Sequence, residues 1–508
     1  MWQTSDGRID RLVAFATVNG KPEPLGELAF QGAGHRRTSV FRYARSWLAA
    51  MGHSLDPAHM PARHAAFISP PDLELPLPFF DACPDGWGKS VIAAAFPDQH
   101  FGAAEYLAAA GDDRTGEVRF GHSPAGGPGR WIPPHPEAMP LPGGDSPLED
   151  LLAASEAAEA GTAGAHHLMA LFRHSADMGG ARPKAALPWK GSHWIAKFRT
   201  LSDAFDDPRA EAVCLTLARA CGIEVPDHEV IEVTGRSVLM IQRFDREPGG
   251  ERLGYTSAAT LMGVPPMTYA TRLTYAEIAT KARQHGVVPC DAELFRRMLF
   301  NCFVRNTDDH LRNHGFVRRG AEWRISPAFD LTLNRGTRLV LAPCPGFPPE
   351  PDPAAAFASY PAFGLDRREA IGLYEQMAAG MRTLHHALEM HGVTESDRAL
   401  LLDRWEDVRS PPPLSELAPS KLVRPARSAG GDPAGRLAEL EIAVNLDTHT
   451  AQKAGRAIVI RRKDTGRIDN TEGSPARVRD AWTTSPIMEY FNDGDRVPPE
   501  NVSAAAKP

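Results

Sequence analysis

The segments Cys302–Val317, CFVRNTDDHLRNHGFV, and Trp323–Asn334, WRISPAFDLTLN, decide how this chain folds. They place Asp308 after an apolar helical stretch, Asn313 five positions later and Asp330 a further 17 positions on, after two short strand-like stretches. Phosphoryl transfer requires a carboxylate near the acceptor hydroxyl and oxygen ligands for the magnesium ions that neutralise the triphosphate. The spacing supplies that set and, apart from its leading residues, matches the catalytic-loop pattern of protein kinases. We therefore predict a phosphoryl-transfer centre built on these three residues.

Two other interpretations of this segment remain open. Asp, Asn and His side chains also cap helices and shape turns, and these residues could do only that here. Alternatively, the cluster Asp308, Asp309 and His310 could hold a metal ion that activates water, as in a metal-dependent hydrolase. The hydrolase interpretation leaves the upstream motifs unexplained, so we favour phosphoryl transfer.

The strand-like sequence HWIAKF places Lys197 among apolar residues. A buried lysine needs an anionic partner because desolvating an unpaired ammonium is costly. Glu211 lies 14 residues later, on the predicted helix RAEAVCLTLARACG, and could pair with Lys197 as the strand lysine of kinases pairs with its helix glutamate. Alternatively, Lys197 extends from an edge strand into solvent and Glu211 is solvated.

Two further motifs are candidates for nucleotide binding. Gly179 and Gly180 in DMGGARPKA would let backbone amides approach a phosphate without obstruction by side chains, although two glycines also suit an ordinary turn. The sequence IQRFDR is a candidate connector between two lobes, where adenine would bond to backbone atoms around Gln242 and Phe244. A core strand that ends in a charged turn would explain the same sequence.

Composition limits the class of protein. The 508 residues are 43% hydrophobic, enough for several domains, and the formal charge of -7 provides no overall basic field for coating nucleic acid. The six cysteines form no CxxC pairs, the N-terminus lacks the pattern of a signal peptide, and no apolar stretch approaches the length of a membrane span. We expect a cytoplasmic protein without membrane association or direct nucleic-acid binding.

The order of motifs predicts an α+β chain with a protein kinase-like two-lobe fold. We expect a small N-terminal α+β domain at 1–122 and a Pro/Gly-rich linker at 123–150. A kinase N-lobe-like region at 151–248 and a helical C-lobe with the catalytic segment at 249–410 should follow. Residues 411–508 are predicted to form a largely flexible extension, although AIVIRRK could be a strand.

The motifs resemble, in order, the signature segments of the HipA-like kinases of bacterial toxin–antitoxin systems. The segments that carry this resemblance are PDGWG, AAAGDDRTGEVRFG, GGARPKA, WIAKF, ACGIEVPDHEVIEV, QRFDR, NTDDHLRN and SPAFDL. Together they cover about residues 10–405 and leave the C-terminal extension outside.

The resemblance implies a serine/threonine protein kinase that uses ATP and Mg²⁺. Asp308 would be the catalytic base, Asn313 and Asp330 the metal ligands and Lys197 the phosphate-binding lysine. The resemblance also implies an aminoacyl-tRNA synthetase as the candidate protein substrate and a HipB-like DNA-binding antitoxin as the partner. A relative that has lost catalysis and acts as a regulatory or antitoxin component is the alternative, but it would have no physical need for all four residues.

The sequence departs from the family pattern in its glycine-rich loop. Asp177 stands where the family carries a regulatory serine, and Ser175 two positions earlier is our candidate autophosphorylation site. A phosphate on Ser175 would add charge of roughly -1.5 to -2 beside an anionic nucleotide, which would inactivate the enzyme. Asp177 could imitate that charge permanently, or both residues could simply cap a turn. Gln242 also replaces a common glutamate, with little expected effect.

Overall fold

The computed structural model describes residues 1–5, 8–32, 37–50, 52–71, 73–133, 146–265, 268, 272–332, 336–405, 408, 411–413, 449–454 and 457–462. The chain divides into two compact units, Met1–Pro419 and Ser420–Pro508. In the second unit β15 (His449–Ala454) and β16 (Ala457–Arg462) form an antiparallel pair, so the strand predicted in AIVIRRK is present. The rest of the extension predicted to be flexible, from residue 414, lies outside the described residues.

The first unit begins with a five-stranded antiparallel sheet in the order β6-β5-β4-β3-β7. Five consecutive residues of β3, Leu12–Ala16, are buried because both faces of this strand are covered. The strands are β3 (Arg11–Val18), β4 (Lys21–Gln31), β5 (Thr38–Tyr43), β6 (Phe67–Ile68) and β7 (Arg119–Gly121), with the pair β1 (Thr4–Ser5) and β2 (Arg8–Ile9) beside them in sequence. The helices are α1 (Arg45–Ala49), α2 (Leu77–Asp81), α3 (Gly86–Ala95), α4 (Ala103–Ala109) and η2 (Pro124–Gly126).

The predicted linker 123–150 contains packed residues at both of its ends. Trp131 is 2% exposed and belongs to the core of the N-terminal domain. At the other end α5 already begins at Leu148, which packs against the next sheet. Residues 134–145 lie outside the described part, and the domain limits stay predictions.

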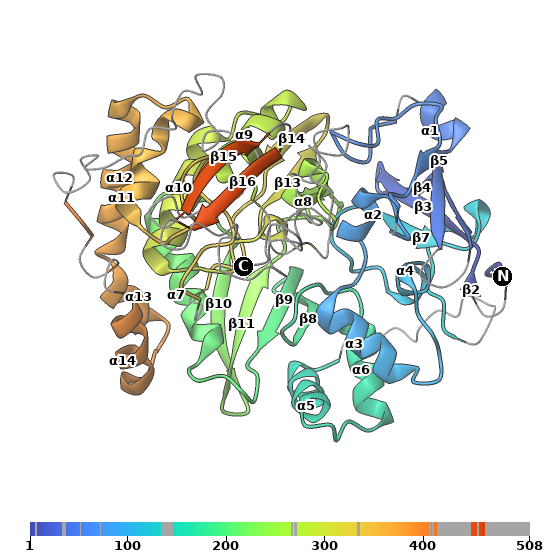
Figure 1. The fold of residues 1–508 in the computed structure, drawn as a ribbon. Helices are drawn as coiled ribbons and strands as arrows, with labels where there is room; N and C mark the ends of the chain where they lie inside the picture. The colour runs from blue at the N-terminus through green and yellow to red at the C-terminus, as the bar shows by residue number, and fades with distance from the viewer. Residues whose placement is uncertain are drawn as a thin grey trace. The chain divides into compact units, whose positions relative to one another are not determined.

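The second sheet is antiparallel in the order β10-β11-β9-β8 and carries the lysine strand in its interior. Helix α7 packs on β10 and β11 (Figure 1). It begins where the Asp206 side chain accepts a hydrogen bond from the Arg209 amide, and it ends just before Gly222, which has a φ of +81°. The elements are β8 (Lys184–Trp189), β9 (Ser192–Phe198), β10 (His228–Val233), β11 (Arg236–Gln242), α5 (Leu148–Glu159), α6 (Ala165–His174) and α7 (Asp207–Ala220).

The remainder of the first unit is mainly helical, around a three-stranded sheet in the order β12-β13-β14. Helix α10 supplies much of the core, with Leu294, Phe295 and the run Met298–Val304 buried. The elements are β12 (Gly254–Ser257), β13 (Gly315–Arg319), β14 (Glu322–Ile325), α8 (Ala258–Met262), α9 (Tyr275–Gln284), α10 (Asp291–Val304), η3 (Leu311–Asn313), α11 (Pro353–Ala358), η4 (Tyr360–Phe363), α12 (Arg367–Met381), α13 (Leu384–Met390) and α14 (Glu395–Arg404).

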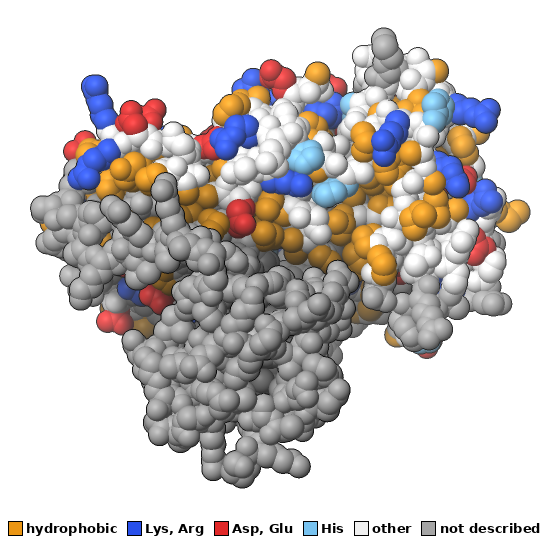
Figure 2. All heavy atoms as spheres, turned by 45° about the horizontal axis from the view of Figure 1, so that its top comes forward, with side chains coloured by type: hydrophobic (Ala, Val, Ile, Leu, Met, Phe, Trp, Pro, Cys, Tyr) orange, Lys and Arg blue, Asp and Glu red, His pale blue; other side chains and the backbone are white. Residues whose placement is uncertain are grey.

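The architecture confirms the predicted α+β, protein kinase-like fold with a small N-terminal domain. None of the helices in the described residues combines the length and the apolar character needed to cross a bilayer. On the face drawn in Figure 2, lysine and arginine side chains are dispersed among apolar and acidic ones. The absence of direct nucleic-acid binding stays a prediction.

Candidate active site

The Lys197 ammonium lies between two carboxylates that come from different parts of the fold. Its Nζ is 2.6 Å from Oε1 of Glu211 on α7, and it also contacts Oδ1 of Asp330, which follows β14. Lys197 is on β9, directly opposite Leu239 of β11, so the sheet fixes its position. The predicted pairing of Lys197 with Glu211 is therefore present, and Asp330 joins it.

Burial and charge act against each other in this cluster. Burial alone would lower the pKa of Lys197, but Asp330 and Glu211 raise it, so the ammonium stays charged. Burial alone would raise the pKa of Asp330, and Lys197 holds it well below the usual range. Burial raises the pKa of Glu211, and the neighbouring Asp330 carboxylate adds to that rise. Because two carboxylates share one ammonium, the cluster would gain from a further cation.

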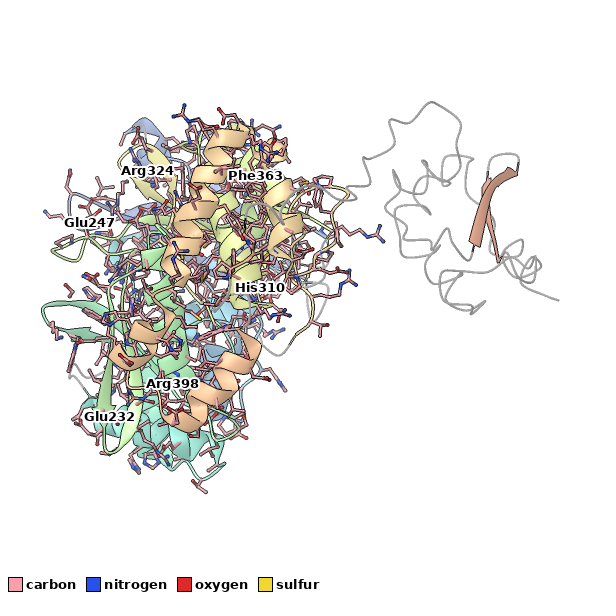
Figure 3. All side chains as sticks on the ribbon, turned by 90° about the vertical axis from the view of Figure 1, so that its left-hand side faces the viewer. Glu232, Glu247, His310, Arg324, Phe363 and Arg398 are labelled. Carbon is pink, nitrogen blue, oxygen red and sulfur yellow. The ribbon has the colours of Figure 1, made fainter. Side chains whose placement is uncertain are left out.

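The catalytic segment, residues 305–313, follows the end of α10 and begins at Arg305, which has a φ of +53°. Asp308 is exposed, and its Oδ1 lies 3.6 Å from Nε2 of His310, which is labelled in Figure 3. Asn313, at the end of η3, donates from Nδ2 to the Asp308 carbonyl oxygen at 2.7 Å. Partial burial raises the pKa of Asp308, and Asp330 raises it further, so the two carboxylates feel each other's charge.

The residues predicted to bind Mg²⁺ have the right donor atoms. Asn313 uses its amide nitrogen to hold the loop, which leaves its carbonyl oxygen as a ligand atom, and Asp330 offers a carboxylate with a side chain 37% exposed. Asp330 has a φ of +51°, a left-handed backbone that few non-glycine residues adopt and that often marks functional sites. Oxygen donors of this kind are those that Mg²⁺ prefers.

The glycine turn, residues 178–184, ends at a second buried lysine, Lys184. Gly179 has no atom within 4 Å of where a Cβ would be, and Gly180 has a φ of +74°. A Cβ on Gly180 would come within 2.7 Å of Nζ of Lys184, but that atom ends a flexible side chain that can move aside, so the positive φ is what favours glycine here. Burial lowers the pKa of Lys184, which lies near Asp330 and Lys197.

The side chain of Arg182 turns away from the glycine turn toward α7. It forms a bidentate bond with Asp203, at 2.8 and 2.9 Å, and an ion pair with Asp207 at 3.2 Å. Burial raises the pKa of Asp207 to about 6. Arg182 therefore ties the turn to the start of the helix that carries Glu211.

Gln242 and Phe244, around which adenine is predicted to bind, already contact other parts of the lobes. The Gln242 amide donates to the Asp227 carbonyl at 2.8 Å, and the Phe244 ring packs 5.4 Å from that of Phe329, the residue before Asp330. Adenine binding around Gln242 and Phe244 stays a prediction. Because the Gln242 amide is already hydrogen-bonded, adenine would have to bond to other backbone groups there.

The arginines of QRFDR hold the AAAGDDRTGEVRFG motif of the N-terminal domain. Arg243 and Arg246 donate to the carbonyl oxygen of Arg114 at 3.0 and 2.8 Å. Asp245 accepts from the Gly116 amide at 2.8 Å. Two motifs about 130 residues apart in the sequence thus form one buried network.

Ser175 and Asp177 are both enclosed. Ser175 is 0% exposed, and its Oγ has no hydrogen-bond partner among the described residues. Asp177 is 5% exposed, accepts from the Asp113 amide at 2.9 Å and lies 3.7 Å from Nη2 of Arg130. Autophosphorylation of Ser175 stays a prediction, and it requires this segment to open. Asp177 is thus held by Asp113 and Arg130, and a damping effect of its charge stays a prediction.

Asp309 has a separate role behind the catalytic segment. It is 0% exposed and accepts from the Tyr275 hydroxyl at 2.7 Å and from the Val340 amide at 2.6 Å. Asn301 donates to the same hydroxyl at 2.8 Å. Within the described ranges, no group of three or more His, Cys, Asp and Glu side chains could hold a metal ion. These contacts occupy the Asp309 carboxylate in the core, whereas the hydrolase interpretation needs it beside Asp308 and His310.

Replacement of Asp309 by asparagine should flatten the dependence of stability on pH. Burial raises the pKa of Asp309 from its ordinary value of 3.8 to about 7, so the folded state binds a proton that the unfolded state has released. This contribution is fully present below about pH 4 and is lost as the pH rises through 7. Urea unfolding at pH 5 and pH 8 should show a smaller loss of stability for Asp309→Asn than for the wild type. Parallel pH dependences would contradict this assignment.

Comparison with known proteins places the chain in a family. The pattern of the HipA-like C-terminal domain matches residues 176–385, and that of the HipA N-terminal domain matches residues 16–121. The chain belongs to the HipA-like family. Its fold is similar to that of a chain in the Shewanella oneidensis MR-1 complex of HipA, HipB and operator DNA. That likeness has a TM-score of 0.56 at 16% identity and covers 78% of this chain and 96% of that chain.

Two proteins of Sinorhizobium fredii named as candidate kinases, Y4dM and Y4mE, are also similar to this HipA-like chain. Each is 28% identical, over 222 and 130 residues respectively. The matched stretches cover 40% and 24% of this chain. They span 53% of Y4dM and 31% of Y4mE, so the chain matches about half the length of one relative and less of the other.

The HipA-like site contains residues that sequence reasoning did not single out. Asp207 lies beside the Lys197 cluster, and Arg312 of the catalytic segment pairs with Asp85 at 2.5 Å. Lys184 is different, because the sequence shows it as a positive charge next to the glycine turn. No local signal indicates that Asp85, more than 200 residues earlier, meets the catalytic segment.

Proposed function

We propose that this HipA-like chain is an ATP- and Mg²⁺-dependent serine/threonine protein kinase. The observation that carries the proposal is the Lys197 ammonium between Glu211 and Asp330, with Asp308 and Asn313 on the adjoining segment. This is the arrangement that phosphoryl transfer requires, because the reaction depends on positioning and on neutralising charge. The family relationship and the likeness to named candidate kinases support it.

The reaction can be assigned to the residues of this chain. Lys197, with Lys184 nearby, would bind the phosphates of ATP, and the amides of Gly179 and Gly180 would face them. The oxygen of the acceptor hydroxyl would bond to the γ-phosphorus, and Asp308 would accept the proton of that hydroxyl. The bond between the γ-phosphorus and the bridging oxygen of ADP would break at the same time.

Asn313 and Asp330 would hold Mg²⁺, which supplies charge neutralisation on the phosphates. Asp308 suits a protein substrate because its side chain is 61% exposed. We propose an aminoacyl-tRNA synthetase as the candidate substrate class and a HipB-like DNA-binding antitoxin as the partner. The latter is supported by the presence of HipB and operator DNA in the Shewanella complex. Both assignments fit the proposed cytoplasmic setting.

Transfer of label from ATP tests the proposed function directly. Purified chain incubated with Mg²⁺ should incorporate label from γ-labelled ATP and none from α-labelled ATP, since only the terminal phosphoryl group moves. Chelation of Mg²⁺ should abolish incorporation. Mass spectrometry should place the phosphate on serine or threonine, and Ser175 is the expected site within the chain. Binding of ATP without any incorporation would instead favour the inactive regulatory relative.

A further inference from the structure

A short segment of the N-terminal domain, Asp85–Gly88 at the start of α3, packs directly on the glycine turn. The Trp87 amide donates to the Gly180 carbonyl at 2.7 Å, and the indole Nε1 of Trp87 donates to the Lys184 carbonyl at 3.1 Å. Trp87 is 8% exposed and shares a core with residues of α6 and β8. The segment therefore bonds the glycine turn at two points, on either side of Arg182.

Close packing reinforces these bonds. A Cβ on Gly86 would lie 2.3 Å from the Gly180 carbonyl oxygen, and a Cβ on Gly88 would lie 2.4 Å from the Met178 carbonyl oxygen. Both obstacles are backbone atoms, which cannot rotate away as a side chain can. The two glycines thus let the N-terminal domain approach the glycine turn more closely than any other residue would allow.

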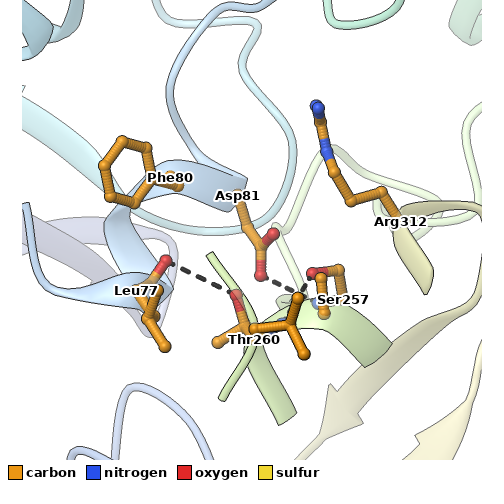
Figure 4. A pocket seen from close by; sticks show the side chains of 8 residues that line it. Leu77, Phe80, Asp81, Ser257, Thr260 and Arg312 are labelled. Atoms are coloured by element: carbon orange, nitrogen blue, oxygen red, sulfur yellow. Dashed lines mark hydrogen bonds between the residues drawn. The ribbon is translucent and has the colours of Figure 1, made fainter. Parts of the chain in front are cut away.

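The same segment also holds the catalytic segment. Arg312 lies between Asp308 and Asn313 in the sequence. Its Nη1 is 2.5 Å from Oδ2 of Asp85. Burial alone would raise the pKa of Asp85, but Arg312 lowers it, so the pair is charged. Arg312 also lines a small pocket with Asp81 at the end of α2 (Figure 4).

The contact of the N-terminal domain with the lobes continues around that pocket. Asp81 accepts from the Ser257 amide at 2.8 Å, and the Thr260 hydroxyl donates to the Leu77 carbonyl at 3.4 Å (Figure 4). The N-terminal domain thus fixes the start of α8 as well as Arg312. The N-terminal domain also contacts the residue just before the glycine turn, because the Asp113 amide donates to the Asp177 carboxylate at 2.9 Å.

We infer that the Asp85–Gly88 segment is a positioning element for phosphoryl transfer. It fixes the position of the glycine turn relative to Arg312, so that the γ-phosphate of ATP and the acceptor hydroxyl are aligned for transfer. This inference rests on the proposed function and extends it. It assigns to the N-terminal domain a direct part in the reaction geometry. Misplacement of a phosphate-binding turn by about 1 Å is enough to lower a rate by orders of magnitude.

Gly88→Ala tests the contact with the glycine turn, and Gly372→Ala is its matched control. Neither glycine has a positive φ and both are helical, but nothing lies within 4 Å of a Cβ on Gly372. We expect Gly88→Ala to raise the KM for ATP by at least about tenfold. The backbone amides of Asp85 and Trp87, which donate to carbonyl groups of the glycine turn, should also exchange with solvent at least about tenfold faster, whereas Gly372→Ala should change neither quantity.

Asp85→Asn tests the second contact and guards against a folding defect, because its side chain is 21% exposed and the change is isosteric. Loss of the charge should loosen Arg312 and lower kcat by about tenfold, with little change in the KM for ATP. Loss of folded protein would lower the apparent kcat and leave the KM for ATP unchanged. The kcat of Asp85→Asn is therefore expressed per mole of ATP-binding sites, and the higher KM of Gly88→Ala is a change that loss of folded protein would not produce.

The outcomes separate this inference from the proposed function. If the wild type transfers no phosphate, the proposed function is wrong, but exchange of the Asp85 and Trp87 amides still decides whether the segment holds the glycine turn. Unchanged exchange in Gly88→Ala would overturn the positioning role whatever the activity. Faster exchange with an unchanged KM for ATP would likewise overturn it, because the held turn would then have no part in nucleotide binding.

Discussion

Replacement of Asp308 by asparagine is expected to lower the rate of phosphate transfer from ATP by about 10³-fold, within the range that loss of a general base produces. Asparagine keeps the size of the side chain but cannot accept the hydroxyl proton. The affinity for ATP should change little, because Lys197 and its two carboxylate partners keep their places. Transfer measured under single-turnover conditions, together with a direct ATP-binding titration, separates these two effects.

The control for this variant is Asp366→Asn. Asp366 caps α12 with its side chain, and asparagine is an equally good cap, so the same chemical change should leave transfer unaffected. Equal loss in both variants would point to the preparation rather than to Asp308. Transfer that survives Asp308→Asn would remove the assignment of Asp308 as the base and would reopen the question of which residue accepts the proton.

The parts of the fold that sequence could predict are those encoded by local patterns. The apolar run around Lys197 predicted a strand, and the periodicity of RAEAVCLTLARACG predicted the helix that carries Glu211. Because a strand followed by a helix places these two residues on adjoining elements, as in the lysine–glutamate pair of kinases, their pairing could be anticipated, although the spacing alone also allowed both side chains to be solvated. The same holds for Asp308 and Asn313, which one short turn joins.

The parts that could not be predicted depend on contacts between distant segments. The sequence QRFDR predicts a connector that binds adenine, and no local signal indicates that its two arginines donate to the Arg114 carbonyl of the N-terminal domain. No periodicity in either motif specifies that partner. Ser175, the residue that follows α6, is buried where α3 packs against α6, and no local pattern specifies that contact. The meeting of Asp85 with Arg312 belongs to the same class.

Removal of the Asp245 carboxylate by Asp245→Ala should lower the free energy of unfolding by about 3 to 5 kcal/mol, the usual effect of breaking a buried ion pair. Asp245 lies 2.8 Å from Nη2 of Arg243 and 2.9 Å from Nη1 of Arg246, and all three side chains are at most 5% exposed. Without Asp245, two buried guanidinium groups would lie close together, with the more distant Asp113 carboxylate, 4.0 Å from Nη1 of Arg243, offsetting only part of their charge. Urea or thermal unfolding measures the loss.

A matched control is Glu322→Ala, which breaks the pair with Arg324, a residue labelled in Figure 3. Both side chains of that pair are more than half exposed, so its loss should lower the free energy of unfolding by less than about 1 kcal/mol. A similar loss in both variants would mean that the Asp245 network contributes no more than a surface pair.

The pH dependence provides an independent check on the same network. Burial alone would raise the pKa of Asp245, but Arg243 and Arg246 hold it well below the ordinary value. The stabilisation is therefore present above the unfolded pKa of about 4 and is lost as the pH falls through the folded pKa. The stability difference between the wild type and Asp245→Ala should stay constant from pH 7 to about pH 5 and should narrow as the pH falls below about 4. A difference that did not narrow would mean that Asp245 acts through packing alone, because packing does not titrate.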